Sequence, residues 1–298
     1  MKHDAQIALD AQNIVGESLI WDHRRNTFFW VDIIGKHIHA FDPENGAHDH
    51  WQTPDFVTSI GLASENGFVV GLCRDVVLWR PGGVFEPLAV PEPDLPENRL
   101  NEGVVGPDGA FWVGTMQNNI FPNGEPKDIT ESTGALYRIT TDGTVNRLSE
   151  PTFGITNTLI WSGDRLITAD TMENALYSFA VDPATGRLSD RKTILEGFAR
   201  GLPDGSAQDS DGMIWNCRVV GGSCLLHLSP AGAQLGLAEL PVSWPTSCAF
   251  GGTNLDQLFV TSARFTMNAA HLRDNPNEGA LVSVQTGGRG TRSHVFGG

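Results

Sequence analysis

The 298-residue sequence lacks several features that define common classes of protein. Lys and Arg total 20 against 35 Asp and Glu, and the net charge of −15 argues against nucleic acid or an anionic membrane as a partner. No apolar run is long enough to cross a bilayer, and the N-terminal residues MKHDAQIALDAQN lack the apolar stretch of an export signal. We therefore expect a cytoplasmic protein.

Cysteine is scarce, and the signatures of several enzyme classes are missing. Without an export signal we expect the four cysteines to be reduced, buried thiols, although Cys217 and Cys224 flank a predicted hairpin and could approach each other. None has CxxC spacing, which argues against a thiolate zinc site. The sequence has no HExxH, no GxSxG and no phosphate-binding glycine loop, which argues against zinc peptidases, α/β-hydrolases and nucleotide chemistry. The nine histidines are expected to be scattered on the surface, with His37, His39, His48 and His50 on outer strands.

What the sequence does contain is a repeat. Residues 201–215, GLPDGSAQDSDGMIW, combine two short apolar runs with an Asp-Gly turn, a strong hairpin signal. Similar segments begin at residues 17, 59, 101, 157, 204 and 246, which are 42, 42, 56, 47 and 42 residues apart. A second predicted hairpin follows each one. Repeats of roughly 40 to 50 residues built from short strands are typical of β-propellers.

The repeat predicts an all-β fold, a six-bladed β-propeller with four antiparallel strands per blade. We expect a single domain over residues 1–298, because each blade packs only against its neighbours. Residues 5–13 contain one further strand, which is expected to pair with the last blade and close the ring. The segment 86–98 is too rich in proline for a helix or a central strand and is expected to be a loop.

The residue that opens the first predicted strand of each repeat carries a side-chain oxygen. If the first strand of each blade lines the channel, these residues converge on one mouth of it. Ser, Thr, Asn and Asp are also ordinary turn residues, so each position taken alone has a purely structural explanation. The six residues are Glu17, Ser59, Asn101, Asn157, Asp204 and Thr246.

Other polar residues are predicted near Asn101. Arg99 lies two positions earlier, so in an extended strand it faces the same way. The longest gap between repeats contains an insertion at residues 116–133, which places Gln117, Asn118 and Asn119 near the same mouth. The alternative is that this insertion is a solvated hairpin tip.

Four separated motifs and a late fifth one resemble a known family. The sequence is similar to the SMP-30/gluconolactonase/regucalcin-like family in segments that follow one another in order along nearly the whole chain. These segments are ESLIWD with WVDI at 17–33, RLNEGVVGPDGAFWVGTM at 99–116, ITNTLIWS at 155–162, LPDGSAQDSDGMIWNC at 202–217 and TSCAFGG at 246–252.

The resemblance implies a six-bladed propeller that holds one divalent cation and hydrolyses sugar lactones. It implies that Glu17, Asn157 and Asp204 are metal ligands, that Asp204 is also the candidate catalytic base, and that Arg99 and Asn101 contact the substrate. The chain departs from several relatives in having amides rather than an acidic residue shortly after GTM, and Thr158 where they have glycine.

The residues themselves agree with this chemistry. Two carboxylates and one amide supply three oxygen ligands, which favours one divalent cation, with Ca²⁺ first and Mg²⁺, Mn²⁺, Zn²⁺ or Fe²⁺ as alternatives. A cation with open positions can polarise an ester carbonyl, so we expect hydrolysis of a polyhydroxylated sugar lactone, bound also by Asn118 and Asn119. The alternatives are a calcium-binding scaffold without catalysis, a protein-binding propeller, or an arylesterase or phosphotriesterase. A monomer or weak homo-oligomer is expected.

Overall fold

The computed structural model describes residues 4–150 and 152–298. The chain divides into two compact units. The first unit comprises Met1–Pro54 and Phe198–Ser293, and the second comprises Asp55–Gly197 and His294–Gly298. The expectation of a single domain over residues 1–298 stays a prediction.

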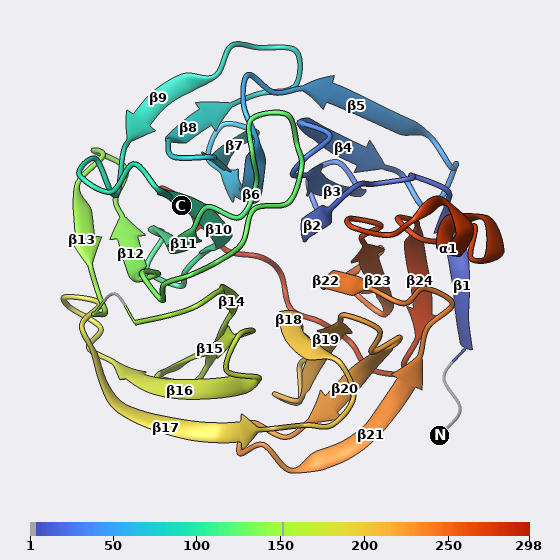
Figure 1. Cartoon of the computed structure of the whole chain (residues 1–298). Coiled ribbons are helices and arrows are strands. Elements are labelled where there is room, and N and C mark those ends of the chain that lie inside the picture. The colour runs from blue at the N-terminus through green and yellow to red at the C-terminus, as the bar shows by residue number, and fades with distance from the viewer. Residues whose placement is uncertain (1–3, 151) are drawn as a thin grey trace. The chain divides into compact units, whose positions relative to one another are not determined.

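The first unit contains three four-stranded antiparallel sheets (Figure 1). Their strands, in order within each sheet, are β2 (Gly16–Asp22), β3 (Thr27–Asp32), β4 (His37–Phe41) and β5 (His48–Gln52); β18 (Leu202–Gln208), β19 (Ile214–Val219), β20 (Cys224–Leu228) and β21 (Gln234–Glu239); and β22 (Pro245–Gly251), β23 (Gln257–Ser262), β24 (Leu281–Gln285) and β1 (Asp4–Leu9). The N-terminal strand β1 pairs antiparallel with β24. The predicted pairing of an N-terminal strand with the last blade is therefore confirmed.

The second unit contains the other three sheets. Their strands are β6 (Val57–Ala63), β7 (Gly67–Leu72), β8 (Val76–Trp79) and β9 (Glu86–Ala89); β10 (Asn98–Val105), β11 (Phe111–Gln117), β12 (Leu136–Ile139) and β13 (Val145–Arg147); and β14 (Thr156–Ser162), β15 (Arg165–Asp170), β16 (Ala175–Val181) and β17 (Leu188–Glu196). A short C-terminal strand, β25 (Val295–Phe296), adds to β6 in parallel. The repeat did not predict β25, because no hairpin connects it to its partner.

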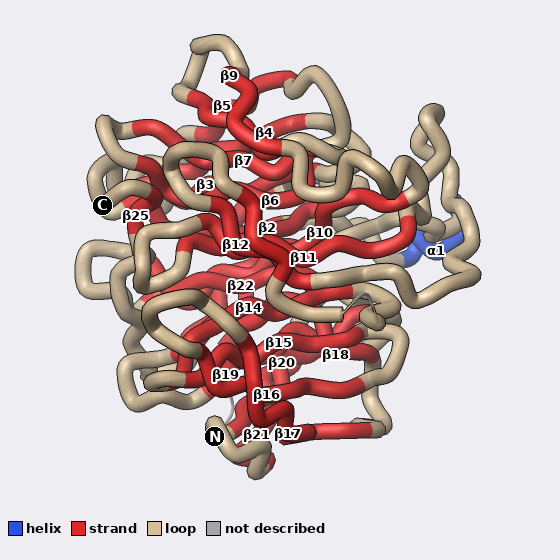
Figure 2. The backbone as a smooth tube through the Cα atoms, turned by 90° about the vertical axis from the view of Figure 1, so that its left-hand side faces the viewer, coloured by secondary structure: helices blue, strands red, loops and turns tan. Residues whose placement is uncertain are grey.

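The six sheets confirm the predicted fold class, a six-bladed β-propeller with four antiparallel strands per blade. Among the described residues, one short helix interrupts the strands: α1 (Ala269–Asp274), the blue segment in Figure 2. The Asn268 side chain begins it by accepting a hydrogen bond from the His271 backbone N–H. The described part of the chain contains no helix with the length and apolar character needed to cross a membrane.

The core lies where the faces of neighbouring sheets pack together. In the first unit, the Phe28 ring on β3 lies 4.3 Å from the Phe259 ring on β23, centroid to centroid, and 4.7 Å from Trp21. All three side chains are buried. Aromatic contacts at these distances contribute beyond the area they bury, so these rings hold consecutive sheets of the unit together.

The proline-rich segment 86–98 differs partly from expectation. Its first residues form β9, the outermost strand of its sheet, where Pro87 is tolerated because an edge strand leaves some N–H groups unpaired. The rest is a loop that buries Glu92. One carboxylate oxygen of Glu92 accepts hydrogen bonds from the Thr115 and Tyr137 hydroxyls, each 2.8 Å long, and the other accepts one of 2.9 Å from Asn98. A buried acidic side chain therefore anchors the loop to its blade.

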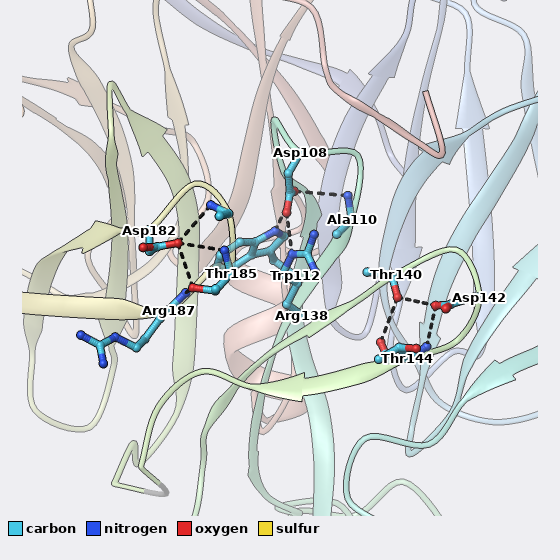
Figure 3. Close-up of polar contacts among 11 residues, drawn as sticks. Asp108, Ala110, Trp112, Arg138, Thr140, Asp142, Thr144, Asp182, Thr185 and Arg187 are labelled. Atoms are coloured by element: carbon cyan, nitrogen blue, oxygen red, sulfur yellow. Dashed lines mark hydrogen bonds and ion pairs between the residues drawn. The ribbon is translucent and has the colours of Figure 1, made fainter.

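The Asp-Gly turns owe their shape to the aspartate side chains, as Figure 3 shows for Asp108. Its carboxylate accepts bonds from the Ala110 backbone N–H (3.2 Å), the Trp112 indole (3.0 Å) and Arg138 Nε (2.6 Å). Burial alone would raise the pKa of Asp108, but the hydrogen bonds, led by that from Arg138, hold it below its usual value. One aspartate thus fixes a turn and ties two neighbouring strands together.

Two other aspartates in the second unit act within their own turns (Figure 3). Asp142 accepts bonds from the Thr140 hydroxyl (2.5 Å) and the Thr144 N–H (3.1 Å). Asp182 accepts bonds from the N–H (2.9 Å) and hydroxyl (2.9 Å) of Thr185. Satisfying backbone donors in this way stabilises a tight turn, which explains the recurrence of aspartate in the repeat.

Candidate functional site

Each innermost strand contains one break in its pairing register near its start. A β-bulge of this kind bends the strand and redirects the side chains beside it. The breaks lie between Glu17 and Ile20, Val57 and Ser59, Leu100 and Gly103, Asn157 and Leu159, Pro203 and Ser206, and Pro245 and Cys248. All six residues singled out by the repeat phase lie at or within these breaks.

Two of the breaks include a residue with a strained backbone. Ser18 and Thr158 have φ angles of 51° and 49°, which side chains other than glycine rarely adopt. They directly follow Glu17 and Asn157, two of the predicted metal ligands. Backbone strain of this kind costs free energy and persists where the surrounding structure enforces it, often beside a functional residue.

In the second unit, Arg99 is held by two amide side chains. Its Nη1 donates to Asn101 Oδ1 at 2.7 Å and to the Leu100 carbonyl at 2.8 Å. Its Nε and Nη2 donate to Asn119 Oδ1 at 3.2 and 2.9 Å. Arg99 is only 5% exposed, so these contacts fix the orientation of the guanidinium group. The structure thus brings together Arg99, Asn101 and Asn119, as the sequence predicted.

The network continues through Asn101 to Asn157. Asn101 Nδ2 donates to the Thr156 carbonyl at 2.8 Å and to Asn157 Oδ1 at 3.2 Å. Asn157 Nδ2 in turn donates to the Thr171 hydroxyl at 2.8 Å, which fixes which way the amide faces. Both asparagines are buried. Thr171, which directly follows strand β15, was not predicted from the sequence, because it belongs to no motif and to no repeated polar position.

The other two amides of the insertion serve the loop itself. Asn118 Oδ1 accepts a hydrogen bond from the Ile120 N–H at 3.1 Å. Gln117 Oε1 accepts bonds from the N–H groups of Thr130 (2.6 Å) and Glu131 (3.1 Å), which pins the far end of the insertion. The Asn118 side chain thus bonds within its own loop, and its predicted contact with substrate stays a prediction.

In the first unit, the innermost strands β2, β22 and β18 lie side by side. Thr246 on β22 donates its hydroxyl to the Gly16 carbonyl on β2, and Ser247 Oγ accepts the Leu19 N–H at 3.1 Å. On the other side, the missing side chain of Gly205 lets β18 approach β22, since a Cβ there would lie 2.9 Å from the Thr246 carbonyl oxygen. Glu17 and Asp204 thereby flank the same strand.

Both carboxylates act on one buried thiol. Burial raises the pKa of Cys217 well above its usual value, and Cys248, Asp204 and Glu17 raise it further. Asp204 and Glu17 both disfavour a negative charge on the Cys217 sulfur, so the negative potential of the two carboxylates extends over the same region around it. A region with this potential suits a cation.

Asp204 rests on a layer of buried polar groups that the sequence did not reveal. Asn216 Nδ2 donates to the Asp204 carbonyl at 3.1 Å, and Asn216 Oδ1 accepts from Arg218 at 3.2 Å. Arg218 is fully buried and also donates to the Gly201 carbonyl at 2.7 Å. Burial lowers its pKa to about 10, against the opposing effects of Cys224 and Asp204. Arg218 is thus a fixed cation that supports the Asp204 backbone.

The four cysteines are free and buried, as expected. The neighbour of Cys217 is Cys248, which hydrogen-bonds with it, whereas Cys224 is paired in the sheet with Arg218. Because residues paired across two strands share a face, Cys224 lies on the face of Arg218 and Cys217 on the opposite face, so the two thiols do not meet across the hairpin.

The donor set fits a divalent cation in its chemistry. In the described part of the chain, no three His, Cys, Asp or Glu side chains are grouped to hold a metal ion. The predicted set does not require such a group, since it consists of two carboxylates and the amide oxygen of Asn157. Hard oxygen ligands of this kind suit Ca²⁺ and similar ions.

Comparison with known proteins gives the family. Residues 15–264 match the family described as the SMP-30/gluconolactonase/LRE-like region, which covers most of the chain. The chain belongs to this family. Among SMP-30/gluconolactonase-like relatives, 6-deoxy-6-sulfogluconolactonase of Pseudomonas putida is 32% identical over 292 residues, with 96% of each chain covered.

Another relative in this family and one solved structure extend the comparison. Pentonolactonase XacC of Haloferax volcanii is 32% identical over 260 residues, covering 86% of this chain and 84% of the relative. A crystal structure described as a calcium-binding protein, regucalcin, from Agrobacterium tumefaciens matches with a TM-score of 0.91 at 24% identity, covering 99% of this chain and 98% of the other. At that identity the structural likeness shows the fold alone.

Proposed function

We propose that this SMP-30/gluconolactonase-like protein is a lactonase that hydrolyses a sugar lactone to the sugar acid with the help of one divalent cation. The observation that carries the proposal is the hydrogen-bonded chain from Asn119 through Arg99 and Asn101 to Asn157, which presents oriented polar groups suited to hydroxylated substrates. The names of two relatives that are 32% identical, a sulfogluconolactonase and a pentonolactonase, support it.

The cation is assigned to Glu17, Asn157 and Asp204. All three lie at the breaks in register that recur in the innermost strands. Ca²⁺ is the first choice because the ligands are oxygens, and Mg²⁺, Mn²⁺, Zn²⁺ and Fe²⁺ are the alternatives. A bound cation of this kind polarises an ester carbonyl and favours ionisation of water, each effect contributing several kcal/mol in the transition state.

The protein's own groups take the remaining roles. Asp204 accepts the proton of the attacking water, and the Asn216–Arg218 layer holds its backbone in place during that transfer. Arg99 binds the ring hydroxyls or a terminal anion of the substrate, and Asn101 and Asn119 keep its guanidinium in one orientation. Asn157 contributes its amide oxygen, which the bond to Thr171 orients.

A substrate panel tests the proposal. Five- and six-membered aldonolactones, a 6-sulfonated gluconolactone, an alkyl γ-lactone, an aryl ester and a phosphotriester are assayed with and without chelator. We expect kcat/KM for the best sugar lactone to exceed that for the alkyl lactone by about a hundredfold, or about 3 kcal/mol in the transition state. Chelation should abolish turnover, and added divalent cation should restore it.

Other results would redirect the assignment. Bound cation without turnover on any substrate would indicate a scaffold, and preference for the aryl ester or phosphotriester would indicate a different hydrolase on the same residues. Full lactonase activity in protein shown by elemental analysis to be metal-free would overturn the role of the cation.

A further inference from the structure

Four histidines gather on one face of two neighbouring strands in the first unit. His37 and His39 lie on β4 and His48 and His50 on β5, and residues two apart on a strand face the same way. The strands pair with His39 directly opposite His50, so all four side chains share one face. His39 is only 7% exposed. The expectation of scattered surface histidines is therefore wrong for these four, because it ignored the register of the hairpin.

The rings lie at distances that suit a shared ion. The His39 ring centroid is 5.8, 5.2 and 5.8 Å from those of His37, His48 and His50, and His50 is 5.1 Å from His37 and 6.0 Å from His48. Two imidazoles on one tetrahedral ion, with metal–nitrogen bonds of about 2.0 to 2.1 Å, have centroids about 5 Å apart and nitrogens about 3.3 Å apart. His39 Nδ1 and His48 Nε2 are 3.0 Å apart and share a hydrogen bond, so a metal ion bound by both nitrogens would take the place of the proton between them.

The nitrogens must still turn toward a common point. As they stand, no three His, Cys, Asp or Glu side chains among the described residues are arranged to hold a metal. A half-turn about the Cβ–Cγ bond exchanges ring nitrogens with ring carbons and keeps the plane in which His39 and His48 stack with Trp30. His39 Nε2 is buried without a hydrogen-bond partner in the described structure, which costs free energy. A change in the orientation of the His39 ring that gave this nitrogen a partner would therefore be favourable.

Burial is the leading cause that lowers the pKa of three of these histidines. Burial lowers the pKa of His39 to about 3, with further lowering by His48, His37 and His50. Burial and then His50 lower the pKa of His37, opposed by Asp32. Burial and then His50 also lower the pKa of His48, opposed by the Asp49 carboxylate.

We propose that the cluster of His37, His39, His48 and His50 binds one divalent transition-metal ion of the class that prefers imidazole, namely Zn²⁺, Ni²⁺ or Cu²⁺. Imidazole nitrogens suit these ions, whereas Ca²⁺ and Mg²⁺ require oxygen ligands. The site is separate from Glu17, Asn157 and Asp204 in its ligand chemistry and does not depend on the proposed lactonase activity. By ligating residues of both strands, the ion fastens the outermost strand β5 to β4.

The test is a calorimetric titration of untagged protein with NiCl₂ in excess Ca²⁺, which keeps oxygen sites occupied. Wild type should bind one Ni²⁺ per chain through this cluster. The double variant His48→Gln/His50→Gln, changed only on the outermost strand, should bind it at least tenfold more weakly, and His37→Gln should weaken it to a smaller degree. Ni²⁺ should raise the melting temperature of wild type and leave that of the double variant unchanged.

His227→Gln is the matched control. His227 also lies on a strand and stacks on a tryptophan, with its ring centroid 4.0 Å from that of Trp215, but it lies outside the cluster. This variant should titrate like wild type. The proposal is overturned if wild type shows no Ni²⁺ binding, or if the double variant binds Ni²⁺ as tightly as wild type does.

Discussion

Arg99 is the residue whose replacement most directly tests the candidate site. It donates hydrogen bonds from two nitrogens to Asn119 Oδ1 and from a third to Asn101 Oδ1 and the Leu100 carbonyl. Hydrogen bonds from a charged group contribute about 1.5 to 3 kcal/mol each when buried partners are left unsatisfied. If Arg99 binds the substrate in the orientation that these amides impose, Arg99→Ala should lower kcat/KM for the best sugar lactone by about a hundredfold, near 2.7 kcal/mol.

Most of the Arg99→Ala effect should appear in KM, because binding shared by the ground state and the transition state is lost. Asn119→Ala removes one acceptor and leaves the Asn101 contact, so we expect a loss of about tenfold in kcat/KM. Because Asn119 acts through Arg99, the double variant should lose no more than Arg99→Ala alone, about a hundredfold rather than the thousandfold that independent effects would give.

The assay is the initial rate of acid release from the lactone, measured with each variant over a range of substrate concentrations. Asn123→Ala is the matched control, since Asn123 is an exposed amide of the same insertion whose oxygen accepts the Glu125 N–H within its own turn. Circular dichroism and urea unfolding check that each variant is folded. Multiplicative losses in the double variant would refute the coupling, and unchanged kinetics in Arg99→Ala would show that the site lies elsewhere.

Three further predictions concern other parts of the molecule. Asp204→Ala should abolish turnover and leave the far-UV circular dichroism unchanged; wild-type rates would show that the base is misassigned. Asp108→Asn should destabilise the protein by about 1 kcal/mol in urea at pH 7, because it weakens the pairing with Arg138. The pKa of Asp108 is depressed in the folded state, so its contribution to the free energy of unfolding is present above the unfolded pKa and is lost as the pH falls through the folded pKa. The difference in free energy of unfolding between wild type and variant should therefore shrink in acid. A difference that stays constant with pH would contradict this. Gly205→Ala should lower the free energy of unfolding by about 1 to 3 kcal/mol, because the added Cβ would collide with the backbone of β22. Gly236→Ala, where an added Cβ meets nothing within 4 Å, should lower it far less. Equal urea midpoints for the two variants would refute the contact.

The strands and turns were predictable because their determinants are local. Alternating apolar residues and Asp-Gly turns such as that at Asp108 act within a few residues, and the repeat then multiplies a weak signal six times. The pairing of β25 with β6 was not predictable in this way, since it joins segments more than 200 residues apart and depends on the burial of Phe296 in the core. The edge strand β9 was missed because proline content was taken to exclude pairing that an outermost strand tolerates.

The candidate site was predictable in the positions of its residues and not in their contacts. The repeat phase and the family resemblance both selected Asn101 and Asn157, and the structure joins them by a hydrogen bond. Residues beneath the site, such as Arg218 and Thr171, escaped notice because their roles depend on burial and on strand register. The histidine cluster shows the same limit: each His-x-His pair is visible in the sequence, but only the register of β4 and β5 brings the two pairs together.

The register break in every innermost strand bears on how a protein of this kind can acquire new specificities. A residue at such a break is released from the regular ladder, so its side chain can be replaced without requiring a compensating change in the neighbouring strand. Six such positions recur, one per blade, and Asn101 and Asn157, whose side chains are hydrogen-bonded to each other, would have to vary as a pair. On the proposed function, a library randomised at these six positions would explore new substrates while the regular strand pairing of each blade is kept.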